Sequence, residues 1–276
     1  MNRALFALYI AAACALAADG PDGASGVFKS QSVTMNVKSA MAFRAPSFAD
    51  KGESIIVAVS NVQLNPETIA DYSDRRRVIE KRIKNAQTGI VYFEFKPDGG
   101  AYRGMSYYFG PGNGCGYCTG TVTANTNLAG GKLTAKLVDA EKDRSFDISL
   151  TVTILTDDHG TPLPADGGEP GKVFLQYHTA MVKGNRTALK ATMSQDQQQY
   201  WSDIERQGKL GSWLYAVGEA HPTKSMQIVK SYISGNKALL LFEGDSPTGK
   251  IAGEALLIKE GDAWRVDDEI TEPARQ

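Results

Sequence analysis

Apolar and polar residues alternate along most of the first half of the chain. The clearest run is 145–154, in which Phe, Ile, Leu and Val occupy every second position between Ser, Asp and Thr. Such alternation buries one face of a strand and leaves the other in water, as in an antiparallel sheet. Further strand patterns lie at 27–37, 54–62, 89–96, 101–109 and 133–140. Residues 26–155 are therefore predicted to form a mostly antiparallel β-sandwich.

One helical pattern interrupts these strands. Asn65 can cap a helix, Pro66 suits its first position, and Glu67 is favourable in its first turn. Apolar residues then recur at helical spacing from Ile69 to Ile83. We expect a single helix here, as an excursion from the sandwich.

The second half begins with helical patterns and ends with strand patterns. A helix with one apolar stripe is predicted from near Gly171, followed by a short helix around Leu189 and a third over 196–207. Strand patterns joined by tight turns then occupy 226–234, 237–243, 250–259 and 263–268. The acidic run 267–269 is interpreted as a charged chain end, and a cation site is the alternative. Helices before a meander predict an α+β domain with the helices on one face of an antiparallel sheet.

The segment between these halves, 156–171, is rich in Gly, Pro and Asp, which is typical of an exposed linker. We therefore expect this segment to separate two domains. The expected parts are a leader (1–17), a tether (18–25), the sandwich (26–155), the linker (156–171) and a second domain (172–272).

Residues 1–17 have the pattern of a secretory signal. Arg3 precedes an apolar run over 4–13 that is too short to span a bilayer, and Ala15-Leu16-Ala17 fits the cleavage rule. The chain is therefore expected to be exported, as a periplasmic or secreted protein. The alternative treats Cys14 as a lipoprotein cysteine that carries a lipid anchor, which the tether would suit. No later segment is long and apolar enough for a transmembrane helix.

The composition is that of an ordinary globular protein. The chain is 42% hydrophobic and 22% charged, and its formal net charge is −1. A near-neutral chain has no electrostatic footprint for nucleic acid, so no nucleic-acid partner is predicted.

The order of elements in the second domain resembles the NTF2-like (cystatin-like cone) family. The resemblance is carried by an entry helix over 172–183, by the pair Tyr200-Trp201, and by the ending Ala255-Leu-Leu-Ile-Lys-Glu-Gly-Asp-Ala-Trp-Arg-Val-Asp-Asp268. It does not extend to the first half. In this family a curved sheet wraps a helix and leaves a conical pocket, which serves binding proteins as well as isomerases and dehydratases. The fold alone therefore leaves the function open.

We expect an exported, non-catalytic protein that binds a small apolar ligand or a protein partner in the cone. The side chains expected to line its pocket are Tyr177, Met181, Tyr200, Trp201 and Trp264. The alternative is an enzyme of the isomerase or dehydratase class that transfers protons through His178 or a strand carboxylate. No acid–base motif of the family maps onto this chain, which favours the binding protein.

Cys115 and Cys118 offer the other candidate chemistry. In an oxidising compartment they predict one disulfide. Thiol redox chemistry is the alternative for a Cys-x-x-Cys pair, but redox catalysts usually place the first Cys at a helix N-terminus, whereas a glycine-rich turn between strands is expected here. A closed zinc site needs four ligands, so we predict neither a metal nor another cofactor.

Overall fold

The computed structural model describes residues 22–30, 33–50, 52–82, 88–109, 114–209, 211, 225–247 and 249–273. The chain divides into two compact units, Met1–Leu64 with Lys81–Thr156 and Asn65–Glu80 with Asp157–Gln276. The predicted leader, including Cys14, lies outside the described residues. Most of the predicted tether also lies outside them, but its last residues, 23–25, already belong to the first strand.

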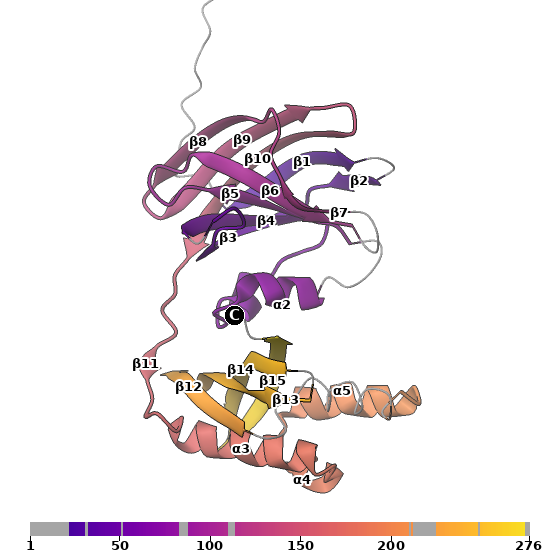
Figure 1. Ribbon diagram of the computed structural model, residues 1–276, viewed down its shortest axis with the longest axis vertical. Coiled ribbons are helices and arrows are strands. Elements are labelled where there is room, and N and C mark those ends of the chain that lie inside the picture. Colours follow the sequence, from indigo (N-terminus) through magenta and orange to yellow (C-terminus); the bar gives the residue numbers. More distant parts are fainter. Residues whose placement is uncertain are drawn as a thin grey trace, which may run out of the picture. The chain divides into compact units, whose positions relative to one another are not determined.

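The first unit is a ten-stranded sheet (Figure 1). Its strands are β1 (Gly23–Ser30), β2 (Val33–Asn36), β3 (Ser39–Pro46), β4 (Glu53–Ser60), β5 (Ile90–Phe95), β6 (Tyr102–Tyr108), β7 (Gly114–Cys118), β8 (Thr123–Ala129), β9 (Lys132–Ala140) and β10 (Arg144–Leu155). One half has the order β2-β1-β10-β9-β8 and the other β3-β4-β5-β6-β7. The last two residues of β10 pair in parallel with β3 and join the halves. The prediction of a β-rich unit is confirmed, in the form of one curled sheet.

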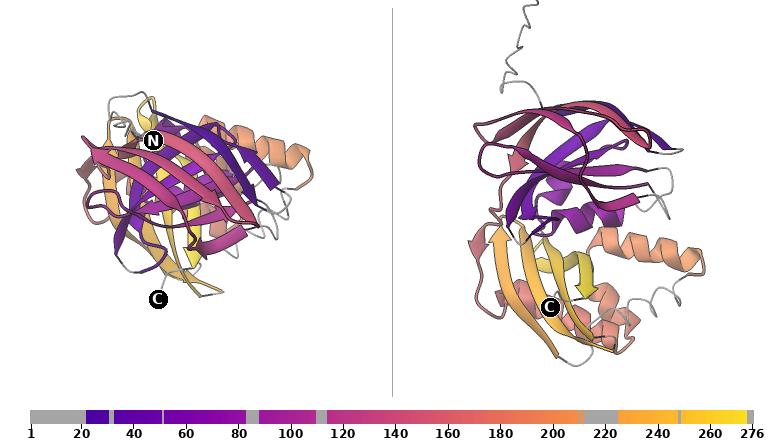
Figure 2. Two further views of the ribbon diagram at one scale, coloured as in Figure 1. Left: turned by 90° about the horizontal axis from the view of Figure 1, so that it is seen from above. Right: turned by 45° about the horizontal axis from the view of Figure 1, so that its top comes forward.

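The two halves of this sheet lie as layers around one apolar core (Figure 2). Every second residue of β10 points into it, which explains the alternation seen in the sequence. Phe146 of β10 meets Phe93 of β5 with ring centroids 5.4 Å apart, and Phe28 of β1 meets Tyr107 of β6 at 5.2 Å. Because aromatic rings dominate buried apolar area, these contacts between layers stabilise the curl.

Two strand predictions in this unit were wrong. The segment 27–37 forms two antiparallel strands, β1 and β2, instead of one. Phe28 and Met35 both face the core, so the apolar pattern continues through the hairpin, and no Gly or Pro marks a turn. The cysteine segment is the strand β7, paired with β6, and not a turn. A strand ladder uses backbone groups, which glycines provide as well as other residues do.

The second unit continues beyond residue 157 with helices and then an antiparallel meander. Its elements there are α3 (Gly168–Val182), α4 (Arg186–Thr192), α5 (Gln195–Arg206), β11 (Thr161–Pro162), β12 (Ser225–Ser234), β13 (Lys237–Ser246), β14 (Gly249–Glu260) and β15 (Ala263–Pro273). The predicted order of helices before strands is confirmed. The predicted linker 156–171 is partly structured, because β11 pairs with β12 and α3 begins at Gly168.

Helices cover one face of the second sheet, here called the inner face (Figure 2). Phe174 of α3 packs on Phe242 of β13 with ring centroids 4.9 Å apart. Side chains alternate along a strand, so Ala255 and Leu257 of β14 share this face while Glu254 points to the opposite, outer face. The inner face therefore supplies the core of the unit.

Residues 65–80, here called the clasp segment, are the remaining part of the second unit. The prediction of a single helix was wrong, because the segment forms α1 (Pro66–Ile69) and α2 (Arg75–Arg82) with a break between them. Asn65 does cap α1, accepting the N–H of Glu67. From the sequence we expected this segment to belong to the sandwich, because predicted strands flank it on both sides. Its contacts instead place it in one compact unit with Asp157–Gln276.

Candidate functional site

Four of the five residues predicted to line a pocket lie together in the core of the second unit. Tyr177, Met181, Trp201 and Trp264 are each less than one-tenth exposed and belong to one apolar cluster on the inner face. Tyr200 is 50% exposed on the other side of α5. The four buried side chains pack on one another and on the sheet, so they fill space within the fold.

Tyr177 meets Glu269 on this inner face. Glu269 lies on β15 opposite Ala255, which belongs to the apolar core. Burial, then the charge of Glu269 and the hydrogen bond to it, raise the pKa of Tyr177 well above its ordinary value. The phenol therefore stays protonated at neutral pH. Two cavities mapped in the described part of the chain, considered below, are lined by other residues.

The two histidines that the structure describes, His159 and His178, lie in different surroundings. His178 is half-buried on α3 and lines neither of those cavities. The ring of His159 lies 5.6 Å from that of Tyr232, and its Nδ1 is buried with no hydrogen-bond partner in the described part of the chain. Burial, followed by the positive charge of Arg75, lowers the pKa of His159.

We expect the second unit to lose stability as the pH falls below about 6.5, the ordinary pKa of histidine. The unfolded chain accepts a proton on His159 that the folded state resists, and the nearby carboxylates of Asp157, Glu254 and Asp158 only partly oppose this effect. Urea unfolding at about pH 7.5 and about pH 5.5 measures the loss. Tryptophan fluorescence reports on this unit because Trp201 and Trp264 are buried in it and the sequence of the first unit contains no tryptophan. The variant His159→Phe should lose less stability over this interval, and an equal loss contradicts the prediction.

One carboxylate holds the clasp segment on the outer face of the second sheet. Glu254 is 7% exposed and accepts the N–H groups of Ser73 and Asp74, each at 2.9 Å, as well as the Ser73 hydroxyl. These donors stand at the start of α2, where N–H groups have no acceptor within the helix. A negative charge also interacts favourably with this end of the helix dipole. Glu254 therefore anchors the residues that precede α2 from a strand that is distant in the sequence, while Asp74 accepts the N–H of Arg77 within the first turn.

Two further polar contacts fix the clasp segment. Tyr72, fully buried, donates to Asp268 at 2.7 Å, and Arg75, 1% exposed, pairs with Asp157 at 2.8 Å. A cavity of about 120 Å³ remains between Arg77 and the strands β12 to β15. Ligand sites usually measure about 300–1,000 Å³. This cavity is too small for a typical ligand, so these contacts serve to attach the segment.

The larger mapped cavity is an open groove of about 590 Å³ between α3 and α4, here called the α3–α4 groove. Val173 and Leu175 contribute apolar walls, and Leu175 is 39% exposed. Ala188 of α4 lies on the opposite wall, while Lys183 and Arg265 add positive charge. The sequence analysis missed this surface because it followed the apolar stripe on the buried side of α3.

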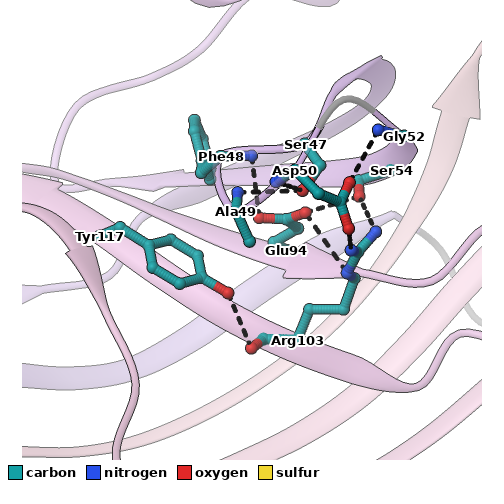
Figure 3. Close-up of polar contacts among 9 residues, drawn as sticks. All are labelled: Ser47, Phe48, Ala49, Asp50, Gly52, Ser54, Glu94, Arg103 and Tyr117. Carbon is teal, nitrogen blue, oxygen red and sulfur yellow. Dashed lines mark hydrogen bonds and ion pairs between the residues drawn. The ribbon is translucent and has the colours of Figure 1, made fainter.

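A buried carboxylate also organises a polar cluster in the first unit (Figure 3). Glu94 of β5 is fully buried and accepts the Ser54 hydroxyl at 2.6 Å and the Phe48 N–H at 3.2 Å. Arg103 of β6 lies 3.6 Å from Glu94, donates to Ser54 at 2.9 Å and pairs with Asp50. The cluster fixes the β3–β4 loop on the sheet. A lone acidic residue in the apolar run of β5 was the signal that could have revealed it.

Tyr117 and the two cysteines lie on β7, beside this cluster. Cys115 and Cys118 are at disulfide distance, in agreement with the prediction of a disulfide. Between them, Tyr117 donates to the backbone carbonyl of Arg103 at 3.1 Å. Its ring covers Gly104 so closely that a Cβ at this position would lie 2.6 Å from the ring. Glycine at 104 therefore allows Tyr117 to hold β7 against β6.

Comparisons with known proteins assign no family, since no family model and no curated protein matches the chain. Among the residues that the structure describes, no cluster of three or more His, Cys, Asp or Glu side chains is arranged to hold a metal ion. No helix in the same residues has the length and apolar character needed to cross a membrane.

Proposed function

We propose that this is an exported, non-catalytic binding protein whose second unit is an NTF2-like domain. The order of α3, α4 and α5 before the meander β12 to β15 supports the proposed family. Trp201 of α5 and Trp264 of β15 are buried in one cluster, as expected if the sheet wraps the helices. A register shift at Leu256 and Leu257 also fits, because a bulge bends a strand and increases its twist.

Binding is favoured over proton transfer by the packing of the inner face. The phenol of Tyr177 and the carboxylate of Glu269 meet on this face. A catalytic pair must come within hydrogen-bond reach of a substrate, and the packing around Tyr177 leaves it buried. Tyr177, Met181 and Trp201 are buried together in the apolar cluster of the inner face, where a ligand inside a cone would bind. We therefore place recognition on the outside of the helices instead of in the interior expected from the sequence.

The α3–α4 groove is the observation that carries this proposal. Its volume of about 590 Å³ lies within the usual range of ligand sites, about 300–1,000 Å³. Apolar walls next to Lys183 and Arg265 suit an amphiphilic partner, which gains from burying apolar surface and from neutralising charge. The groove is formed by α3, α4 and β15 of the folded second unit and does not require the interior to open.

An anionic apolar dye, anilinonaphthalene sulfonate, tests whether the groove binds amphiphilic molecules. We expect saturable fluorescence enhancement with the native protein and at least a fivefold loss of affinity in Ala188→Trp, whose indole would fill the groove (about 1 kcal/mol). Thr187→Trp is the matched control, because Thr187 is exposed on the same helix and does not line the groove. Equal binding by the two variants would remove the groove as a binding site.

A further inference from the structure

We propose that the α3–α4 groove recognises an amphipathic helix of a partner protein, with carboxylates beside the apolar stripe of that helix. This inference rests on the function proposed above and names the chemical class of the partner. Three properties of the groove carry it: the shape of its walls, the state of its backbone groups and the charges at its edge.

The walls of the groove have the shape that a third helix needs. Val173, Gln176 and Ala180 follow one another at helical spacing along α3, and Ala188 and Ala191 do so along α4. Ridges and grooves of helix surfaces interdigitate when the side chains between them leave room. The alanines on both walls allow the axis of a third helix to approach closely.

An apolar anchor point lies on the same surface. Leu175 is 39% exposed although it is a large apolar residue, and it lines the groove together with Val173. Isolated exposed leucines need no explanation, but one that lines a cavity can bury its remaining surface against a partner. An apolar residue of the incoming helix is therefore expected to pack on Leu175.

The backbone of the walls selects a helix over an extended peptide. Most of the wall residues belong to α3 and α4, whose N–H and C=O groups bond mainly within the helices. An extended peptide gains affinity by adding a strand to an open sheet edge, which α3 and α4 do not provide. A partner in this groove must form its backbone hydrogen bonds within its own chain, as a helix does.

The charges select an acidic partner. The groove is lined by the cations Lys183 and Arg265 and by no carboxylate. Nearby cations are already paired: Lys172 with Glu169, and Lys190 with Glu205. In the described part of the chain neither Lys183 nor Arg265 has a carboxylate partner. Two unneutralised cations at the edge of an apolar groove are complementary to carboxylates that flank an apolar stripe.

The test uses the full chain and two labelled synthetic peptides of fifteen residues. Both carry leucine at heptad spacing; one has glutamate at the flanking positions and the other has lysine. Fluorescence anisotropy at low salt should show that the glutamate peptide binds at least about tenfold more tightly than the lysine peptide. High salt should reduce this difference, because it screens exposed charges.

Two variants link the preference to the residues named. The double variant Lys183→Gln/Arg265→Gln should bind the glutamate peptide about tenfold more weakly and the lysine peptide no more weakly than the native chain. Glutamine is chosen because a carboxylate at position 183 would oppose the dipole at the end of α3. Unchanged urea unfolding by tryptophan fluorescence establishes that the second unit of the double variant is folded.

The outcomes separate this inference from the function on which it rests. If both peptides bind equally, or if neutralising the cations has no effect, the acidic helix is the wrong partner. If neither peptide binds while the dye still distinguishes Ala188→Trp from Thr187→Trp, the partner is not a helix and the groove remains a binding site. If the dye binds both variants equally, the proposed function fails as well.

Discussion

Replacing Glu94 by alanine is expected to lower the free energy of unfolding of the first unit by about 3–5 kcal/mol. Glu94 is fully buried, and its carboxylate accepts hydrogen bonds from Ser54 and from the N–H of Phe48. Its removal leaves these donors without an acceptor and leaves Arg103, 18% exposed, with Asp50 as its remaining carboxylate partner. Removing one member of a buried ion pair lowers the free energy of unfolding more than replacing both members does, because the remaining charge stays buried without its partner.

Urea unfolding followed by far-ultraviolet circular dichroism measures this loss. Tryptophan fluorescence provides an internal reference, because it reports on the second unit alone. Glu53→Gln is the matched control: Glu53 pairs with Arg44 on the neighbouring strands, but both side chains are 40% or more exposed. An exposed pair contributes about 0–1 kcal/mol. A Glu94→Ala variant as stable as Glu53→Gln would show that the buried cluster does not stabilise the sheet.

Replacing Glu254 by alanine is expected to destabilise the second unit by about 2–4 kcal/mol. The substitution removes the acceptor of two N–H groups and one hydroxyl at the start of α2, together with the charge that the helix dipole favours. The clasp segment should then detach more readily from the outer face of the second sheet. Its remaining contacts include those of Tyr72 with Asp268 and of Arg75 with Asp157.

Amide hydrogen exchange locates the effect, and tryptophan fluorescence during urea unfolding gives its size. The N–H groups of Ser73 and Asp74 should exchange faster in Glu254→Ala than in the native chain. The matched control is Glu243→Gln, since Glu243 is exposed on the adjacent strand β13. Unchanged protection at Ser73 and Asp74 would mean that other contacts suffice to hold the segment.

Local sequence patterns predicted most of the helices and strands, because such patterns show which face of a helix or strand is buried. The alternation over 145–154 reappears as β10, and the cap at Asn65 appears where the sequence placed it. The hairpin within 27–37 was missed because alternation alone does not mark a turn between two strands that face the same core.

Glu269 shows why the candidate site was harder to predict. Counting every second residue from Trp264 and Val266 puts Asp268 on the inner face. The register shift in the β14–β15 pair inserts one residue, so that Glu269 faces inward beside Tyr177 and Asp268 faces outward toward Tyr72. The acidic run 267–269 was therefore read as a chain end, because nothing in its composition marks a bulge.

Contacts between distant segments were beyond the reach of local patterns. Glu254 and Asp74 are 180 positions apart, and no spacing rule connects them. The α3–α4 groove likewise arises from two helices and a residue of β15, Arg265. Its alanines and exposed leucine give no signal in the sequence of either helix. They line a groove only when α3 and α4 pack side by side.

The clasp segment constrains the order in which parts of the protein can fold. During synthesis from the N-terminus, residues 65–80 emerge long before Glu254 and Asp268, to which they attach. Closing a loop of this length costs conformational entropy and delays contact formation. Tyr72, which ends up buried and donates to Asp268, must meanwhile remain without this partner. The nascent chain therefore passes through a stage in which a binding factor that shields apolar segments would prevent aggregation.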